Sequence, residues 1–218
     1  MSHTNLDKKE LATKKMVDGF NLILEGLGLD LTSEHLVNTP ERAARAWREE
    51  LCRGLTQLEP KISLFTTSVD EMVVLRHIPI RSLCAHHLLP FIGEATVAYV
   101  PGTGKLIGIS KLSRIADYWA RRPQIQELLT AQIADHVAGL VVDEDPDWER
   151  LGWHKKSRKQ GPRGGVGVVI HARHLCMEVR GVGHVGDMVT SSLRGVFLTK
   201  PEARAEFLQL IRTEDSRI

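Results

Sequence analysis

Residues 92–100 read Ile-Gly-Glu-Ala-Thr-Val-Ala-Tyr-Val, and the pair Pro101-Gly102 follows this run directly. The run is rich in β-branched residues, which favour strands, and the Pro-Gly pair is typical of a turn. The segment Met72 to Leu75 has the same character, and residues 165–182 are strand-like throughout. A short strand is expected at residues 105–109. These segments predict that the middle and C-terminal parts of the chain form an antiparallel sheet.

Helical patterns surround the strand-like segments. Between residues 7 and 25 apolar residues recur at helical spacing, and glycines follow as stop signals. We expect a second helix from Ser33, and a third with Thr39 as its N-cap and Pro40 in its first turn. Ser110 is well placed to cap a helix that reaches about residue 122. Two more helices are predicted, at residues 123–140 and 201–211.

This order of elements predicts an α+β fold with helices on one face of the sheet. We expect an N-terminal helical region at residues 1–58 and a second domain at residues 59–218, with an exposed charged loop at 143–164. The basic half of that loop leaves phosphate or nucleic-acid binding open, although a solvated loop is the simpler interpretation. Because a pair of strands does not bury both its faces alone, self-association is also expected.

The overall charge excludes some classes of function. The 29 lysines and arginines nearly balance the 27 aspartates and glutamates, so the whole chain has no electrostatic drive toward nucleic acid or membrane. The polar N-terminus lacks the apolar segment of a signal peptide, and no later run is long and apolar enough to span a bilayer. We therefore expect a cytoplasmic protein without nucleic-acid or membrane partners.

Cysteine and histidine occur together at two places. Cys84 and His87 lie three residues apart, and His174 and Cys176 would share one face of a strand. Zinc binds thiolate and imidazole readily, and three protein ligands with one open position are typical of a catalytic site. The alternative is that the cysteines are buried small apolar residues and the histidines are ordinary polar groups. Spacing alone does not decide which of the neighbouring Cys and His residues would bind.

Three longer runs carry a family resemblance. They are SLCAHHLLPFIGEATVAYVP (residues 82–101), LIGISKLSRIADYWARRPQIQELLTAQI (106–133) and HARHLCMEVRGV (171–182). In this order they resemble GTP cyclohydrolase I, over about residues 38–197 with one long interruption. The resemblance implies zinc-dependent hydrolytic opening of the GTP imidazole ring, with loss of formate and formation of 7,8-dihydroneopterin triphosphate. It also implies the tunnelling fold, in which sheets from several subunits close into a barrel, and a homodecamer with active sites between subunits.

The resemblance assigns roles to particular residues. It implies that Cys84, His87 and Cys176 bind zinc and that His86 and His174 transfer protons, which suits the imidazole pKa near neutrality. It gives the guanine base to Gln126 and Glu127, since one carboxylate can accept from two neighbouring N–H groups. The resemblance also implies that Ser110 lies near the ribose. The residues implied to bind the triphosphate are Lys111, Arg114, Arg180 and Arg42, and Arg45 forms a basic pair with Arg42.

Two departures from the family pattern bear on activity. Ala85 stands where the family usually has glutamate, and the segment at residues 183–188 is shorter than usual. They leave two alternatives open: a diverged relative that gives a ring-opened formamidopyrimidine-type product, and a non-catalytic paralogue that binds a nucleotide. The downstream pathway, whether to folate, a pterin cofactor or a deazaguanine product, stays open as well.

Overall fold

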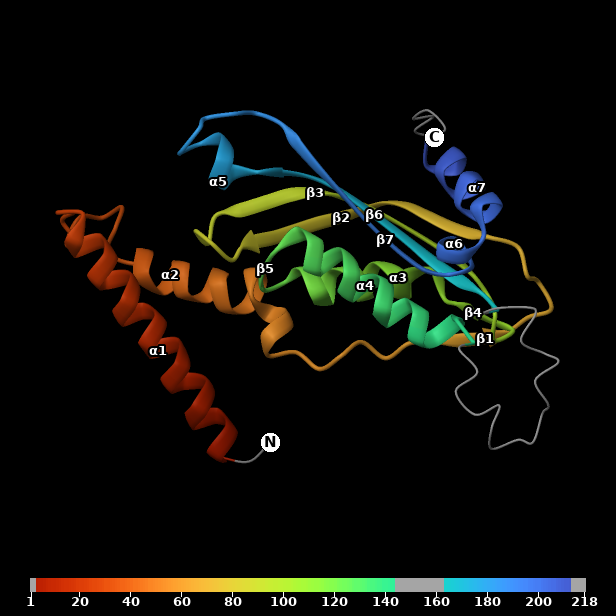
Figure 1. Cartoon of the computed structure of the whole chain (residues 1–218). Helices are drawn as coiled ribbons and strands as arrows, with labels where there is room; N and C mark the ends of the chain where they lie inside the picture. Colours follow the sequence, from red (N-terminus) through yellow and green to blue (C-terminus); the bar gives the residue numbers. More distant parts are fainter. Residues whose placement is uncertain (1–2, 144–162, 213–218) are drawn as a thin grey trace. The chain divides into compact units, whose positions relative to one another are not determined.

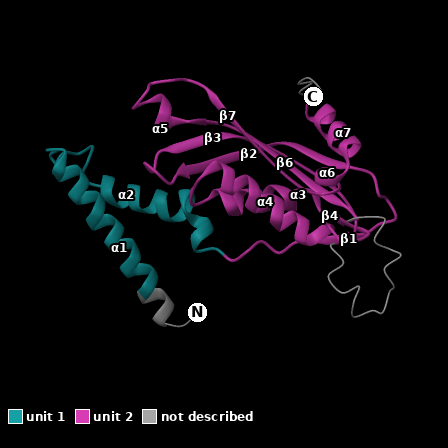
Figure 2. Cartoon of the chain, in the orientation of Figure 1, with its two compact units in different colours: residues 1–57 teal, residues 58–218 magenta. Residues whose placement is uncertain are grey.

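The computed structural model describes residues 3–143 and 163–212, with side chains from Lys8 onward. Contacts within the chain separate two compact units, Met1–Gln57 and Leu58–Ile218, shown in different colours in Figure 2. Almost all of the predicted charged loop at 143–164 falls outside the described residues.

The first unit is helical. It contains α1 (His3–Gly26), α2 (Thr39–Ala46), a π-helical turn η1 (Trp47–Leu51) and a 3-10 turn η2 (Arg53–Leu55). Phe20 of α1 packs edge-on against Trp47, with ring centroids 5.9 Å apart. The helix predicted from Ser33 is wrong, because residues 31–38 form turns. There the carboxylate of Asp30 accepts from both the N–H and the hydroxyl of Thr32, and such local bonds compete with helix formation.

The second unit is built on a five-stranded sheet with the order β5-β2-β3-β6-β7. Its strands are β2 (Val73–Cys84), β3 (Pro90–Val100), β5 (Pro123–Gln124), β6 (Gly165–His174) and β7 (Asp187–Gly195). All neighbours run antiparallel except β5, which lies parallel to the end of β2. A separate two-stranded sheet joins β1 (Leu64–Thr66) to β4 (Lys105–Ile107). β2 is far longer than the predicted strand at 72–75.

Two long helices, α3 (Ile109–Ala120) and α4 (Gln126–Val141), pack on one face of the large sheet (Figure 1). Apolar residues of both helices, among them Leu112, Ile115 and Ile133, join the alternate inward residues of β2, β3 and β6 in one buried core. The short helices α6 (Val196–Thr199) and α7 (Pro201–Arg212) form a smaller core with Ala98 and Val169. The α+β fold expected from the sequence is confirmed, but the helices do not all lie on one face, because Ala98 and Val169 point away from the face that α3 and α4 cover. None of the helices within the described ranges is long and apolar enough to cross a membrane.

Three boundaries near the motifs that carry the family resemblance differ from expectation. The strand predicted at 165–182 ends at His174 and is followed by the helical turn α5 (Leu175–Glu178). The helix predicted from Pro123 begins only at Gln126, because Pro123 and Gln124 form the short strand β5. The helix after β4 begins at Ile109 with Gly108 as its N-cap, so Ser110 lies inside the first turn and does not cap it.

Candidate active site

The sheet topology brings the two Cys-His segments together. Strands β2 and β6 flank β3 on either side. Both run toward the same end of the sheet, since each is antiparallel to β3. Cys84 is the last residue of β2, and His174 is the last residue of β6. Segments about ninety residues apart in the sequence therefore end side by side, as Figure 1 shows for β2, β3 and the start of α5.

At this end of the sheet Cys84, His174 and Cys176 form a cluster of possible metal ligands, whose donor atoms all lie within 4.8 Å of one another. Cys84 is 5% exposed, and the Nδ1 atom of His86 lies 3.7 Å from its sulfur. Burial raises the pKa of the Cys176 thiol, and the nearby Cys84 sulfur adds to this effect. Two thiols and one imidazole are a donor set that zinc prefers, so this cluster, called the thiol cluster below, fits that metal.

The reason that Cys176 joins the cluster differs from the one predicted. Alternation along a strand was expected to place His174 and Cys176 on one face, but Cys176 lies in α5, beyond the end of β6. The helical turn, together with the strand end, carries its sulfur toward Cys84. The expected proximity is therefore found, although its structural cause was wrong.

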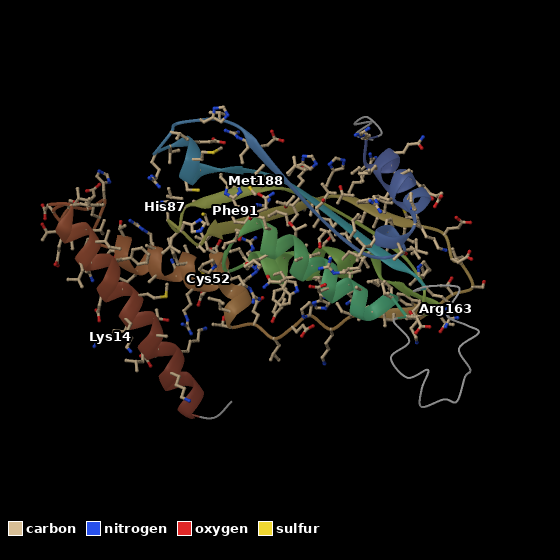
Figure 3. The ribbon with its side chains drawn as sticks, viewed as in Figure 1. Lys14, Cys52, His87, Phe91, Arg163 and Met188 are labelled. Atoms are coloured by element: carbon tan, nitrogen blue, oxygen red, sulfur yellow. The ribbon has the colours of Figure 1, made fainter. Side chains whose placement is uncertain are left out.

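His87 lies on the turn that joins β2 to β3, at the end of the sheet where Figure 3 labels it. The turn is closed by hydrogen bonds from Leu88 N to Cys84 O and from Cys84 N to Leu89 O, both 2.8 Å long. The guanidinium of Arg180 donates to Nε2 of His87. The structure thus places His87 against Arg180, and the imidazole within the thiol cluster is that of His174.

His174 is held from two sides. Its ring stacks on that of Phe91, with centroids 4.7 Å apart and planes 10° apart, and Phe91 itself is fully buried. Its Nε2 atom lies 2.8 Å from Oε1 of Gln126. Burial lowers the pKa of the His174 imidazole, and the carboxylate of Glu127 opposes that effect. His174 is therefore an imidazole with two contacts that orient its ring beside two thiols.

The two residues expected at the guanine base lie in different environments. Both begin α4, but Gln126 is 1% exposed whereas Glu127 is exposed in the first turn of the helix. The negative charge of the Glu127 carboxylate favours the protonated form of His174 and so opposes the lowering of its pKa by burial. Of the pair, only Glu127 presents its side chain to the surroundings of the protein.

The residues expected at the ribose and phosphates lie on other elements. Ser110 and Arg114 are exposed on α3 and Lys111 is half-buried there. Within residues 3–143 and 163–212, no hydrogen bond or ion pair joins these three side chains to the thiol cluster. Arg42 belongs to the first unit, where it donates to His35 O and to the hydroxyl of Thr39, each at 3.0 Å.

Several contacts at the site were not anticipated from the sequence. The stacking of Phe91 on His174 follows from their direct pairing across β3 and β6, which requires the register to be known. The N–H of Ala85 donates to Gln124 O at 2.9 Å, which fastens the β2–β3 turn to β5. Asp187, in the shortened segment, opens β7 with its carboxylate 3.8 Å from the ring of His171.

Comparisons with known proteins agree with the geometry. The family model described as GTP cyclohydrolase I matches residues 16–144 and 156–212. A "GTP cyclohydrolase 1" of Carboxydothermus hydrogenoformans is 43% identical over 202 residues, covering 91% of this chain and 94% of the relative. A "GTP cyclohydrolase 1 1" of Pseudomonas aeruginosa is 47% identical over 193 residues, covering 87% and 92%. One from Hahella chejuensis is 42% identical over 203 residues, covering 91% and 96%.

Proposed function

Because the chain belongs to the GTP cyclohydrolase I family, we propose that it hydrolyses the imidazole ring of GTP, releases formate and forms 7,8-dihydroneopterin triphosphate. The family membership rests on a match to most of the chain. The observation that carries the proposal within this structure is the thiol cluster, where Cys84 and Cys176 lie beside the imidazole of His174 at one end of the sheet.

Zinc is the proposed cofactor, with Cys84, His87 and Cys176 as its ligands. The two thiols already lie together, and His87 sits three residues after Cys84 on a short turn. Because a guanidinium only donates, Nε2 of His87 carries a lone pair, and zinc would take the place of Arg180 on it. Zinc bound at such a site lowers the pKa of water to about 7 and so makes a nucleophile available at neutral pH.

The chain's own residues then handle protons and orientation. The attack occurs at the carbon between the two imidazole nitrogens of guanine, and the C–N bond that breaks needs a proton on its nitrogen. His174 can accept a proton from the attacking water and return it there, since its stacked and hydrogen-bonded ring is fixed beside the thiols. His86, next to the Cys84 sulfur, is the second proposed proton-transfer residue.

Substrate binding is assigned to Glu127 and to the polar residues that the family resemblance implies. Glu127 accepts from the guanine N–H and amino groups, and Gln126 is expected beside it by family resemblance. A triphosphate requires several cations, and the proposed phosphate and ribose contacts are Arg180, Lys111, Arg114, Arg42 and Ser110. The exposed positions of Ser110, Arg114 and Arg180 are compatible with contact to a ligand.

The assembly is part of the same proposal. We infer that residues 59–218 form a catalytic domain of the tunnelling fold and that residues 1–58 form a helical extension. Strand β7 is the last strand at its side of the five-stranded sheet, and an unpaired sheet edge invites pairing with another copy. A homodecamer that closes its sheets into a barrel, working in the cytoplasm, is the expected form.

A second ligand set is favoured by one specific observation. In the structure the imidazole that lies with both thiols is that of His174, and His87 contacts Arg180. Zinc content of His87→Ala and His174→Ala decides between the two sets. Loss of zinc in His87→Ala alone supports the proposed ligands, and loss in His174→Ala alone supports the cluster as it stands.

Product identification tests the function itself. Purified zinc-loaded protein is incubated with GTP, and formate and pterin fluorescence are measured together. Release of formate with a fluorescent pterin after oxidation supports the proposal. A change in absorbance without a pterin would indicate the formamidopyrimidine alternative, and binding of GTP without any product would indicate the non-catalytic paralogue.

A further inference from the structure

Gln126 is a buried polar side chain whose amide is held in one orientation. Its amide nitrogen donates to the backbone carbonyls of Ile170 and Met188, at 3.1 and 3.0 Å, and to the hydroxyl of Thr190 at 3.1 Å. Backbone carbonyls only accept, so an amide turned the other way would set its oxygen against two oxygens. The neighbours on β6 and β7 therefore determine which end of the amide is which.

The orientation of the Gln126 amide determines which ring nitrogen of His174 carries the hydrogen. The amide oxygen of Gln126 faces His174 Nε2 at 2.8 Å, and because an amide oxygen only accepts, Nε2 must be the donor. A neutral imidazole carries one N–H. The Nδ1 atom of His174 is thus left with the free lone pair.

A ring of hydroxyl contacts supports the amide. The Thr130 hydroxyl donates to the backbone oxygen of Gln126 at 2.7 Å, so the Thr190 hydroxyl donates to Thr130 Oγ1 at 2.6 Å and accepts from the Gln126 amide. Gln126 and Thr130 are each 1% exposed. Both the nitrogen and the oxygen of the Gln126 amide therefore have partners within the protein.

We propose that Gln126 is a positioning residue that acts through His174, and that its side chain does not contact the guanine base. This inference rests on the proposed function, since it assigns Gln126 a part in the proton transfer by His174. The two residues that the resemblance assigns to guanine thus have different roles. Exposed Glu127 faces the substrate. Buried Gln126 determines which nitrogen of His174 carries the hydrogen and how the imidazole is rotated in its plane. Phe91 fixes the plane of the same ring.

Steady-state kinetics of the zinc-loaded full chain separate the two roles. Gln126→Leu removes the acceptor for His174 and should lower kcat by about 10 to 100-fold, the usual loss when the partner of an active-site group is removed, with KM for GTP unchanged. Gln126→Glu keeps an acceptor oxygen and should retain more of kcat than the leucine variant. Thr190→Val is the matched control, because it disturbs the same buried network without touching His174, and its kcat should stay near that of the natural chain.

A comparison substrate sharpens the test. Inosine triphosphate lacks the exocyclic amino group of guanine, so a lost guanine contact would change the preference for GTP over this analogue. The positioning role predicts an unchanged preference in both Gln126 variants. A rise in KM for GTP with kcat retained, or a lost preference, overturns the inference. If the leucine variant does not fold, the same two measurements on Gln126→Glu decide.

A structural readout keeps the inference separate from the proposed function. If the natural chain makes no product from GTP, the proposed function fails, and crystal structures of the variants still decide the role of Gln126. The imidazole of His174 should leave its stacked position on Phe91 in Gln126→Leu and keep it in Thr190→Val. An unmoved imidazole in the leucine variant contradicts the positioning role.

Discussion

Replacing Phe91 by leucine should impair catalysis more than its effect on stability would suggest. Phe91 is fully buried and stacks on His174, with ring centroids 4.7 Å apart. An aromatic pair of this kind contributes about 0.5–1.5 kcal/mol beyond the buried area. Since about 1.4 kcal/mol corresponds to a tenfold change in rate, loss of the orientation that the stack provides should lower kcat up to about tenfold. In Phe91→Leu the leucine keeps most of the apolar volume, so the fold should persist.

A matched variant separates orientation from general destabilisation. Phe197 is also fully buried, but it lies in the smaller core, where it packs edge-on against Phe207 at 5.4 Å. Phe197→Leu should lower Tm by a similar amount, about 2–4 °C for each kcal/mol in a domain of this size, and leave kcat unchanged. Thermal unfolding and steady-state turnover of GTP are measured for both. Equal losses of kcat in the two variants, or full activity in Phe91→Leu, would show that the stack on Phe91 does not orient His174 for catalysis.

Three further changes test other parts of the site and the fold. Burial lowers the pKa of His136, which accepts from the Trp119 indole at 3.1 Å, and the nearby Glu59 only partly opposes this effect. As pH falls below about 6.5, the unfolded chain therefore takes up this proton more readily than the folded chain does. Stability should therefore decline from pH 7 toward pH 5.5, and urea unfolding should show a smaller decline in His136→Gln. Glu127→Gln should raise KM for GTP about 10 to 100-fold, the loss of about 1.5–3 kcal/mol expected for bonds to a charged group, and affect inosine triphosphate less; equal effects on both would count against a guanine contact. Ala85→Glu should increase kcat if the missing carboxylate limits the reaction, as the exposed position of Ala85 leaves room for the longer side chain.

The parts of the fold set by local pattern could be predicted from the sequence. The β-branched run at 92–100 became β3, and the apolar spacing before residue 26 became α1. The helix expected from Ser33 failed, because side-chain bonds around Asp30 compete locally with a helix and a weak pattern does not reveal them. The long β2 and the separate β7 were missed, since their polar and charged residues face the less covered side of the sheet and hide the strand pattern.

The candidate site shows the same limit. Spacing drew attention to Cys84 and Cys176, yet their proximity depends on the pairing of β2, β3 and β6, which no local pattern contains. The contact between Phe91 and His174 depends on strand register for the same reason. The burial of Gln126 was not foreseen either, because this polar residue beside Glu127 was expected at the substrate and its side chain is 1% exposed. Only the three-dimensional network showed what its amide contacts.

The central claim is that the two thiols hold the zinc on which the reaction depends. The most direct measurement is formate released from GTP by metal-depleted protein as zinc is added back, with Cys176→Ala measured beside the natural chain. Release by the natural chain should rise with zinc and level off near one equivalent per chain, whereas the folded Cys176→Ala variant should neither retain zinc nor release formate. Formate release by zinc-free protein, or by the variant at the rate of the natural chain, would contradict the central claim.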